Sequence, residues 1–139
     1  MQVKLGDVIE AIACTDDEMT YYYSKKTEKV ELVVEGMADY EAVADEIEEN
    51  SDQYLRQPSP YEINDYQKMI DFIDGLPVGQ ETQRLTRAIN GHGAFRRFRD
   101  VLERFGLTQK WYDFKDAATR QQAIEWCQEN QVSFTDKKD

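Results

Sequence analysis

Apolar residues recur with helical spacing at two places in the first 54 residues of the chain. Both sets lie at i, i+3, i+4 and i+7, the spacing of one buried helical face. They are Leu5, Val8, Ile9 and Ile12, and Tyr40, Val43, Ala44 and Ile47. Asp7 followed by Glu10 has the form of a capping box, which predicts a helix from about Asp7 to Cys14. Asp39 is the predicted N-cap of the second helix.

The segment between these helices changes to a strand pattern. Residues 19–24 are aromatic and threonine-rich, and residues 30–35 alternate between apolar and polar positions. The apolar face of the second run consists of Val30, Leu32 and Val34. The polar residues 25–29 between the runs predict a β-hairpin, although no Gly or Asn fixes the turn type. Because a lone hairpin is marginally stable in water, residues 54–56 are a candidate third strand.

The C-terminal part of the chain is helical in period throughout. Four helices are predicted: one that ends at Gly75, one over residues 80–90, one over residues 93–105, and one from Trp111 to about Asn130. Glycines directly follow three of the predicted helix ends, where a left-handed residue commonly stops a helix.

Together these elements predict an α+β fold in a single domain, residues 1–139. An N-terminal helix and a hairpin, extended to three antiparallel strands by the candidate third strand, would pack on a C-terminal bundle of about four helices. The proline-rich segment 57–60 separates an acidic α/β half, residues 1–56, from a helical half, residues 61–130. Residues 131–139 are expected to form a tail.

The charge of the chain is unevenly distributed. The net charge is -11, and residues 1–54 account for it with 15 acidic residues against four lysines. Residues 55–139 contain 13 acidic and 13 basic residues. An acidic surface repels nucleic acid and attracts basic surfaces, so the two halves suit different partners.

Several classes of chemistry find no support in the residues. His92 is the only histidine, and Cys14 and Cys127 are far apart, so no zinc-ligand spacing exists and no cofactor is expected. The two cysteines are expected to be buried free thiols in a reducing cytoplasm.

No nucleophile motif is present, so we expect no enzymatic activity, although the 28 acidic residues leave open a pair of carboxylates that meet by chance. No apolar run of about 18 residues predicts a membrane span, and the N-terminus lacks an export signal.

An acidic stripe is predicted along the outer side of the second helix. It consists of Glu41, Asp45, Glu48 and Asp52, spaced four, three and four residues apart without a neutralising base. One interpretation is a solvated helix face. The other is a docking surface for a basic protein partner. The tyrosine-rich run 21–23 offers a further surface, and a homodimer formed by sheet extension stays open.

The segment from Gly91 to Arg99 is the second candidate site. Gly91 and Gly93 on either side of His92 permit positive φ, and a helix that starts there presents unpaired N–H groups to an anion. The cations in reach are Arg96, Arg97 and Arg99. We expect i,i+4 pairs to occupy most arginines, Arg96 with Asp100, Arg99 with Glu103 and Arg104 with Asp100, and to leave Arg97 free. The alternative is a purely structural turn between two helices, in which Phe95 and Phe98 are core residues rather than a stacking surface for bases.

The run Gly91-His-Gly-Ala-Phe-Arg-Arg-Phe-Arg-Asp100 resembles a bacterial family of uncharacterised small proteins with a GAFRRF core motif. The similarity continues in residues 3–11, 21–27, 69–73, 111–114 and 123–126. It implies a cytosolic protein with no assigned activity, cofactor or catalytic residue. The chain departs from the family pattern at Thr27-Glu28, where Thr-Gly is expected, so the turn geometry is open.

Two functional hypotheses follow. The first is a non-catalytic, cytosolic protein-interaction or regulatory module that binds another protein through the acidic stripe. The alternative is recognition of a phosphate-bearing ligand or nucleic acid at Gly91–Arg99.

Overall fold

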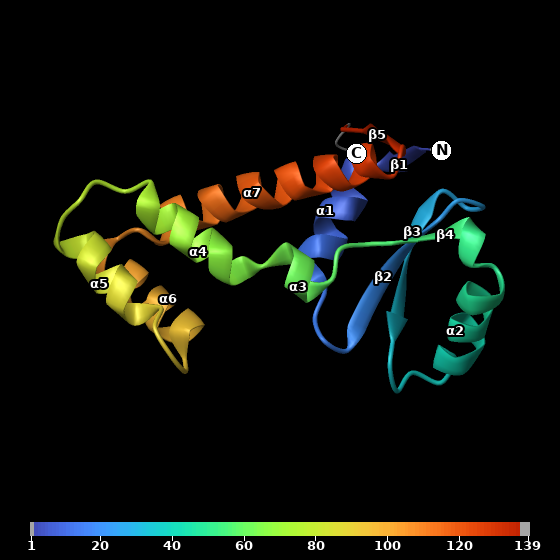
Figure 1. Ribbon diagram of the computed structural model, residues 1–139, viewed down its shortest axis with the longest axis horizontal. Helices are drawn as coiled ribbons and strands as arrows, with labels where there is room; N and C mark the ends of the chain where they lie inside the picture. The colour runs from blue at the N-terminus through green and yellow to red at the C-terminus, as the bar shows by residue number, and fades with distance from the viewer. Residues whose placement is uncertain (1, 137–139) are drawn as a thin grey trace. The chain divides into compact units, whose positions relative to one another are not determined.

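A computed structural model describes residues 2–136 and has the predicted α+β fold (Figure 1). The chain divides into two compact units. The first unit comprises the chain up to Ile63 together with the chain from Thr119 onward, and the second comprises Asn64–Ala118. The long helix α7 (Thr108–Glu129) contributes its first half to the second unit and its second half to the first unit.

A three-stranded antiparallel sheet organises the first unit. The predicted hairpin is formed by β2 (Met19–Ser24) and β3 (Lys29–Val34), and the predicted third strand is β4 (Tyr54–Arg56), which pairs with β2. Two further strands were not predicted: β1 (Gln2–Lys4) pairs in parallel with β5 (Ser133–Thr135). Strand β5 lies within the segment expected to be a tail, and residues 137–139 lie outside the described residues.

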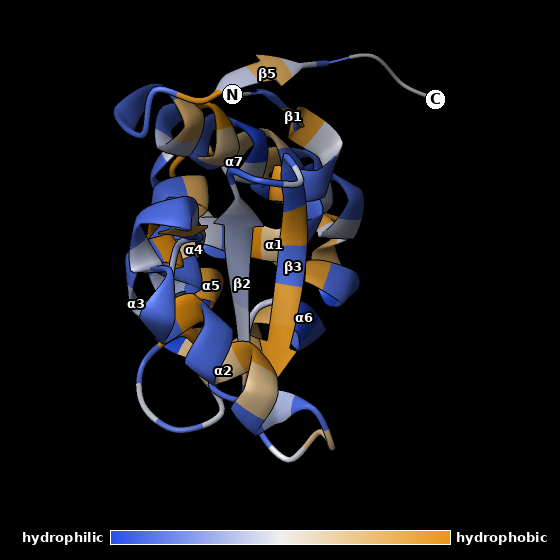
Figure 2. Cartoon of the chain, turned by 90° about the vertical axis from the view of Figure 1, so that its right-hand side faces the viewer, coloured by the Kyte–Doolittle hydropathy of each residue, from blue (hydrophilic) through white to orange (hydrophobic). Residues whose placement is uncertain are grey.

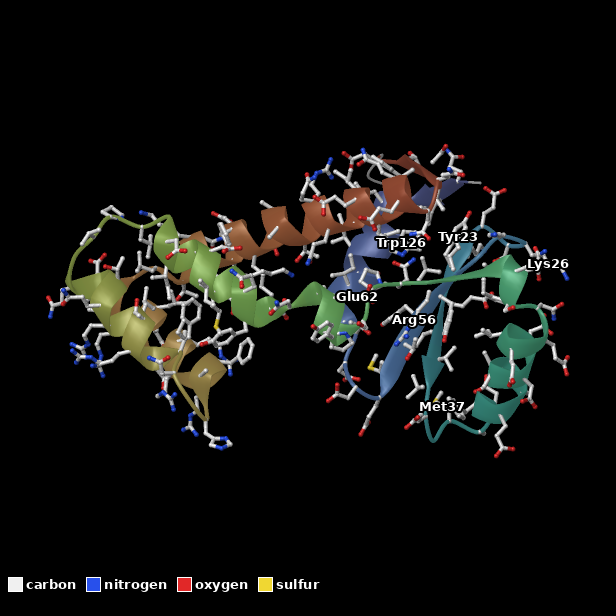
Figure 3. All side chains as sticks on the ribbon, in the orientation of Figure 1. Tyr23, Lys26, Met37, Arg56, Glu62 and Trp126 are labelled. Atoms are coloured by element: carbon white, nitrogen blue, oxygen red, sulfur yellow. The ribbon has the colours of Figure 1, made fainter. Side chains whose placement is uncertain are left out.

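The core of the first unit lies on one face of this sheet. Tyr23 is fully buried there, and its ring meets Trp126 of α7 edge-on at a centroid distance of 6.3 Å. The Tyr23 hydroxyl donates to the Gln2 carbonyl at 2.9 Å, and the Trp126 indole N–H donates to the Arg56 carbonyl at 2.9 Å. Figure 3 labels Tyr23, Trp126 and Arg56 in this region. Two buried aromatic side chains therefore connect β1, β2, β4 and α7.

The opposite face of the sheet lies against helix α2 (Tyr40–Glu49), and Val33 is buried on this face. Val30, Leu32 and Val34 share the other face of β3, as predicted, and Val30 packs against the core there, whereas Leu32 is 44% exposed. Figure 2 shows that the end of β3 nearest α2 is its most hydrophobic part. Both faces of β3 are therefore partly covered, one by the core of the first unit and the other by α2, and alternation identifies only the first of them.

Both predicted helices of the first unit exist, with different starts or ends. Helix α1 (Leu5–Cys14) begins directly after β1, with Lys4 at the N-cap and no side-chain cap, so the predicted Asp7–Glu10 capping box is wrong. Helix α2 follows Asp39 at the N-cap, but the Asp39 side chain makes no capping bond. Two short helices complete the unit, η1 (Ser51–Gln53) and α3 (Pro60–Ile63).

The hairpin turn resolves the geometry that the sequence left open. Glu28 has φ 58°, the left-handed conformation in which a glycine is least strained. Its carboxylate accepts a hydrogen bond from the Gln2 backbone N–H at 2.9 Å. The non-glycine residue at this turn thus gains a contact to β1 that glycine would lack.

The second unit contains the helices that the sequence predicted. They are α4 (Asp65–Asp74), α5 (Gln80–Ala88), α6 (Ala94–Phe105) and the first half of α7. The core is an aromatic cluster in which Trp111 lies edge-on to Phe98 at 4.9 Å and to Phe72 at 5.4 Å. Phe95 is 49% exposed, so its predicted core position is wrong. Ala94, Phe98 and Leu102, spaced four residues apart, form the buried line of α6 instead.

We expect replacement of Asn64 to destabilise α4. Asn64 is the N-cap, has φ 50°, and accepts a hydrogen bond from the Gln67 N–H at 3.1 Å. Asn64→Ala removes the capping hydrogen bond and places an alanine, which disfavours positive φ, in the left-handed region. We expect the free energy of unfolding to fall by about 1–2 kcal/mol. Asn64→Gly should cost less because glycine tolerates positive φ. Urea unfolding followed by circular dichroism measures both, and equal loss in the two variants would contradict this account.

The two cysteines differ in exposure, and we expect them to differ in their reactivity towards a thiol reagent. Both thiols are free, but Cys14 is exposed, contrary to the expectation that it is buried, whereas Cys127 is fully buried. Burial also raises the pKa of the Cys127 thiol, which lowers its reactive thiolate fraction. A thiol reagent should therefore modify Cys14 rapidly in the native protein and Cys127 only after denaturation. Rapid native labelling of Cys127, read by mass spectrometry, would show that the first unit opens readily.

Candidate interaction surfaces

The acidic stripe lies at the surface of the first unit, with one change from the prediction. Glu41, Asp45 and Glu48 are exposed on α2. Asp52 is also exposed, but α2 ends at Glu49, so Asp52 belongs to η1 rather than to the same helix. None of these carboxylates forms an ion pair within residues 2–136. The stripe is therefore unneutralised, as the sequence predicted.

A groove of about 340 Å³ runs between α2 and the sheet and was not predicted. Its apolar and aromatic lining is Tyr22, Val33, Tyr40, Ala44 and Ile47, and its carboxylates are Asp17, Glu18, Glu35 and Glu48. The acids come from three separate parts of the chain: the loop before β2, the end of β3, and α2. The sequence signal was the apolar face of α2, which was assigned wholly to the core.

Local hydrogen bonds hold the acidic end of this groove. The Asp16 side chain accepts from the Glu18 N–H and from the Met19 N–H, each at 2.9 Å, which fixes the loop before β2. The Glu35 N–H then donates to the Glu18 carbonyl at 3.3 Å, so these two acidic residues lie side by side. These hydrogen bonds therefore hold the acidic end of the groove in place at the open end of the hairpin.

The Tyr54 hydroxyl of β4 lies near carboxylates of β3 and α2. Burial raises the pKa of the Tyr54 hydroxyl, and the carboxylates of Glu31 on β3 and Glu46 on α2 raise that pKa further. Since the neutral phenol is favoured, Tyr54 adds no charge to the surface at neutral pH.

The Gly91–Arg99 segment is a clamped turn between α5 and α6. Gly91 has φ 83° and Gly93 has φ 74°, so both predicted positive-φ glycines are confirmed. The Arg97 guanidinium donates to the carbonyl of Ala88 at 3.0 Å and to the carbonyls of Asn90 and His92. Arg97, which was predicted to be free, therefore donates to three backbone carbonyls of the turn. His92 is exposed.

The predicted ion pairs along α6 do not form. Within the described residues, Arg96, Arg99 and Arg104 make no ion pair with Asp100 or Glu103. Spacing of i,i+4 permits such contacts, but at an exposed face they stabilise by only about 0.3–0.5 kcal/mol, too little to hold long side chains in place.

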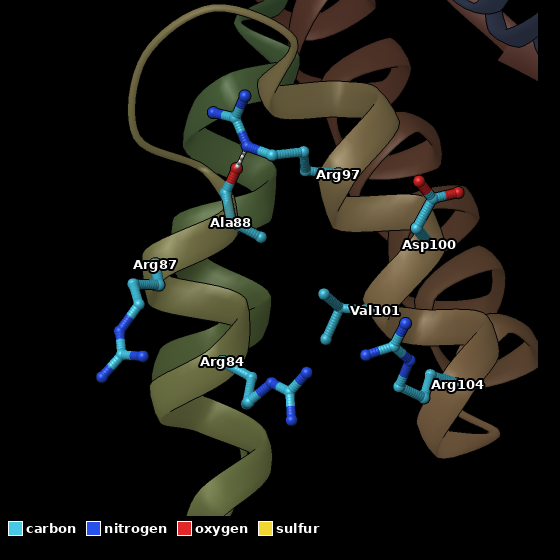
Figure 4. A pocket seen from close by; sticks show the side chains of 7 residues that line it. All are labelled: Arg84, Arg87, Ala88, Arg97, Asp100, Val101 and Arg104. Carbon is cyan, nitrogen blue, oxygen red and sulfur yellow. Dashed lines mark hydrogen bonds between the residues drawn. The ribbon is translucent and has the colours of Figure 1, made fainter.

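A second groove, of about 410 Å³, lies between α5 and α6 (Figure 4). It is lined by Arg84, Arg87, Ala88, Arg97, Asp100, Val101 and Arg104. From the sequence, Arg104 was expected only to pair with Asp100, and no role was predicted for Arg84 or Arg87. Their basic character was visible, but only the packing of α5 on α6 places Arg84 opposite Arg104.

No group of three or more His, Cys, Asp or Glu side chains in the described part of the chain is arranged to hold a metal ion. Among the same residues, no helix combines the length and the apolar character needed to cross a bilayer.

The structure thus defines a small α+β protein with exposed grooves of opposite charge. The chain belongs to the uncharacterised protein family UPF0158, whose family model matches residues 1–139. The prediction that the chain belongs to an uncharacterised protein family is confirmed. No curated protein and no solved structure matches the chain.

Loss of the Arg97 clamp should destabilise the second unit. Arg97→Ala removes three hydrogen bonds from a charged donor, and we expect a loss of roughly 2 kcal/mol in the free energy of unfolding. Arg97→Lys should recover little of it because an ammonium lacks the planar fork that reaches several carbonyls. Arg96→Ala, an exposed neighbour, is the matched control and should change stability little. Equal stability of Arg97→Ala and wild type in urea would refute the clamp.

Proposed function

We propose that the protein is a non-catalytic interaction module whose acidic groove binds a basic segment of another protein. The observation that carries the proposal is the groove between α2 and the sheet, where carboxylates surround an apolar and aromatic floor. Such a lining suits a peptide that combines Lys or Arg with an apolar side chain.

The acidic stripe extends the charge of this groove. Glu48 lies at the edge of the groove, and Glu41 and Asp45 continue outward on the same helix. A partner's basic segment would be attracted by the stripe before its apolar residue reaches Val33 and Ile47. In this proposal the charges of the stripe raise the association rate of the partner, and the apolar contacts on the floor lower its dissociation rate.

The proposal involves no cofactor and places the protein in the cytoplasm. An exposed free thiol at Cys14 suits a reducing compartment. The alternative, recognition of phosphate or nucleic acid at Gly91–Arg99, has weaker support because the backbone carbonyls of the turn already engage Arg97.

The test uses charge reversal of the stripe. Asp45→Lys combined with Glu48→Lys should weaken binding of a labelled lysine- and leucine-containing peptide by about tenfold or more, measured by fluorescence anisotropy. Wild-type binding should also weaken as salt is raised. The same pair of proteins, used for capture from lysate, should differ in the basic partner retained.

The control is an equal charge change elsewhere on the first unit. Glu125→Lys with Glu129→Lys places two lysines on exposed positions of α7, away from the groove. If this control weakens binding as much as the stripe variant, the effect is one of net charge alone and the proposal fails. Undiminished binding by the stripe variant would also reject it.

A further inference from the structure

Two arginines face each other across the groove between α5 and α6. Figure 4 shows Arg84 from α5 and Arg104 from α6 directed into the groove, with Val101 between them. Like charges in such an arrangement repel, and the repulsion is relieved when an anion lies between them. The groove therefore has the charge pattern of an anion site.

No carboxylate of the described chain neutralises this pair. Asp100 lines the same groove, but its side chain points away from Arg84 and Arg104 in Figure 4, and it forms no ion pair with either. Arg87, on the outer side of α5, also forms no ion pair among residues 2–136. The guanidinium forks therefore keep their donors for a ligand.

The groove is held in shape before any ligand arrives. The Arg84 guanidinium lies over the Phe105 ring, 5.8 Å from its centroid, which limits its rotation while leaving its N–H edge accessible. At the other end, the Arg97 clamp fixes α5 to the start of α6. Preorganisation lowers the entropy cost of binding.

The shape and floor of the site favour a peptide over a nucleic acid. Ala88 and Val101 form an apolar floor, which suits an apolar side chain better than a phosphate backbone. A shallower hollow of about 340 Å³ continues along α5 past Thr82, Thr86 and Asn90 and shares Arg87 with the groove.

We infer that the α5–α6 groove is a second docking site, which binds an acidic segment of another protein with an apolar side chain on the Val101 floor and carboxylates between Arg84 and Arg104. The inference is independent of the proposed function, because it concerns a different unit and a ligand of opposite charge.

The experiment titrates the 139-residue chain into a labelled peptide in which glutamate and leucine repeat with helical spacing. We expect saturable binding by the wild type. In the double variant Arg84→Ala with Arg104→Ala, the dissociation constant of the peptide should rise by about tenfold for each arginine removed. Arg84→Lys with Arg104→Lys should restore part of the affinity through charge alone. Circular dichroism and the thermal midpoint confirm that each variant is folded.

The matched control removes equal charge from the same helical hairpin. Arg96 and Arg99 are exposed on α6 outside the groove, so Arg96→Ala with Arg99→Ala should bind the peptide nearly as well as wild type. Equal weakening in this control, or an absence of peptide binding by wild type, would overturn the inference. So would preferential binding of a single-stranded oligonucleotide that depends on Arg84 and Arg104, since it would assign the groove to nucleic acid.

Discussion

The edge-on contact between Tyr23 and Trp126 is the interaction on which the first unit depends. Tyr23 is fully buried at the centre of the sheet, and Trp126 approaches it from α7. Each ring also carries a polar atom, and each polar atom bonds a backbone carbonyl of a short three-residue strand, at Gln2 and at Arg56. Short strands have few ladder bonds of their own, so these two side-chain bonds hold β1 and β4 to the core. With one face of the sheet fixed in this way, the other face is available to α2 and to the acidic groove.

The second unit uses a charged side chain for a similar purpose. The carbonyls at the end of α5 lack helical partners, and Arg97 bonds those of Ala88 and Asn90, while the Tyr66 hydroxyl donates to that of Ile89 at 2.9 Å. A cation at a helix C-terminus is also favoured by the helix dipole. The arginines of this segment therefore differ in role: Arg97 stabilises the turn through its hydrogen bonds, whereas Arg96 and Arg99 are exposed. Glycine suits position 93 because its φ is 74°, and an added Cβ would also lie 3.3 Å from the Arg97 guanidinium.

The distribution of charge gives the two units different surfaces. The acidic residues of the first unit gather around an apolar groove at α2, whereas arginines of the second unit line an apolar groove between α5 and α6. In both grooves the apolar floor would provide most of the binding energy, and the charges would select the sign of the partner.

The sequence by itself determined the α+β class, the hairpin with its third strand, and the helices of the second unit, because periodicity and terminal glycines are local signals. It also determined that the stripe on α2 is unneutralised, since no base lies within reach on that helix. The structure alone decided which side chains work together. The pairing of β1 with β5 joins the two ends of the chain, and the three-residue runs involved carry no pattern of their own. Three features depend on how α6 is rotated against α5: the exposure of Phe95, the hydrogen bonds of Arg97, and the position of Arg84 opposite Arg104. Helical spacing predicts which residues share a face but does not predict which other element that face contacts. Contacts of this kind involve residues distant in sequence, so packing rather than local pattern selects them.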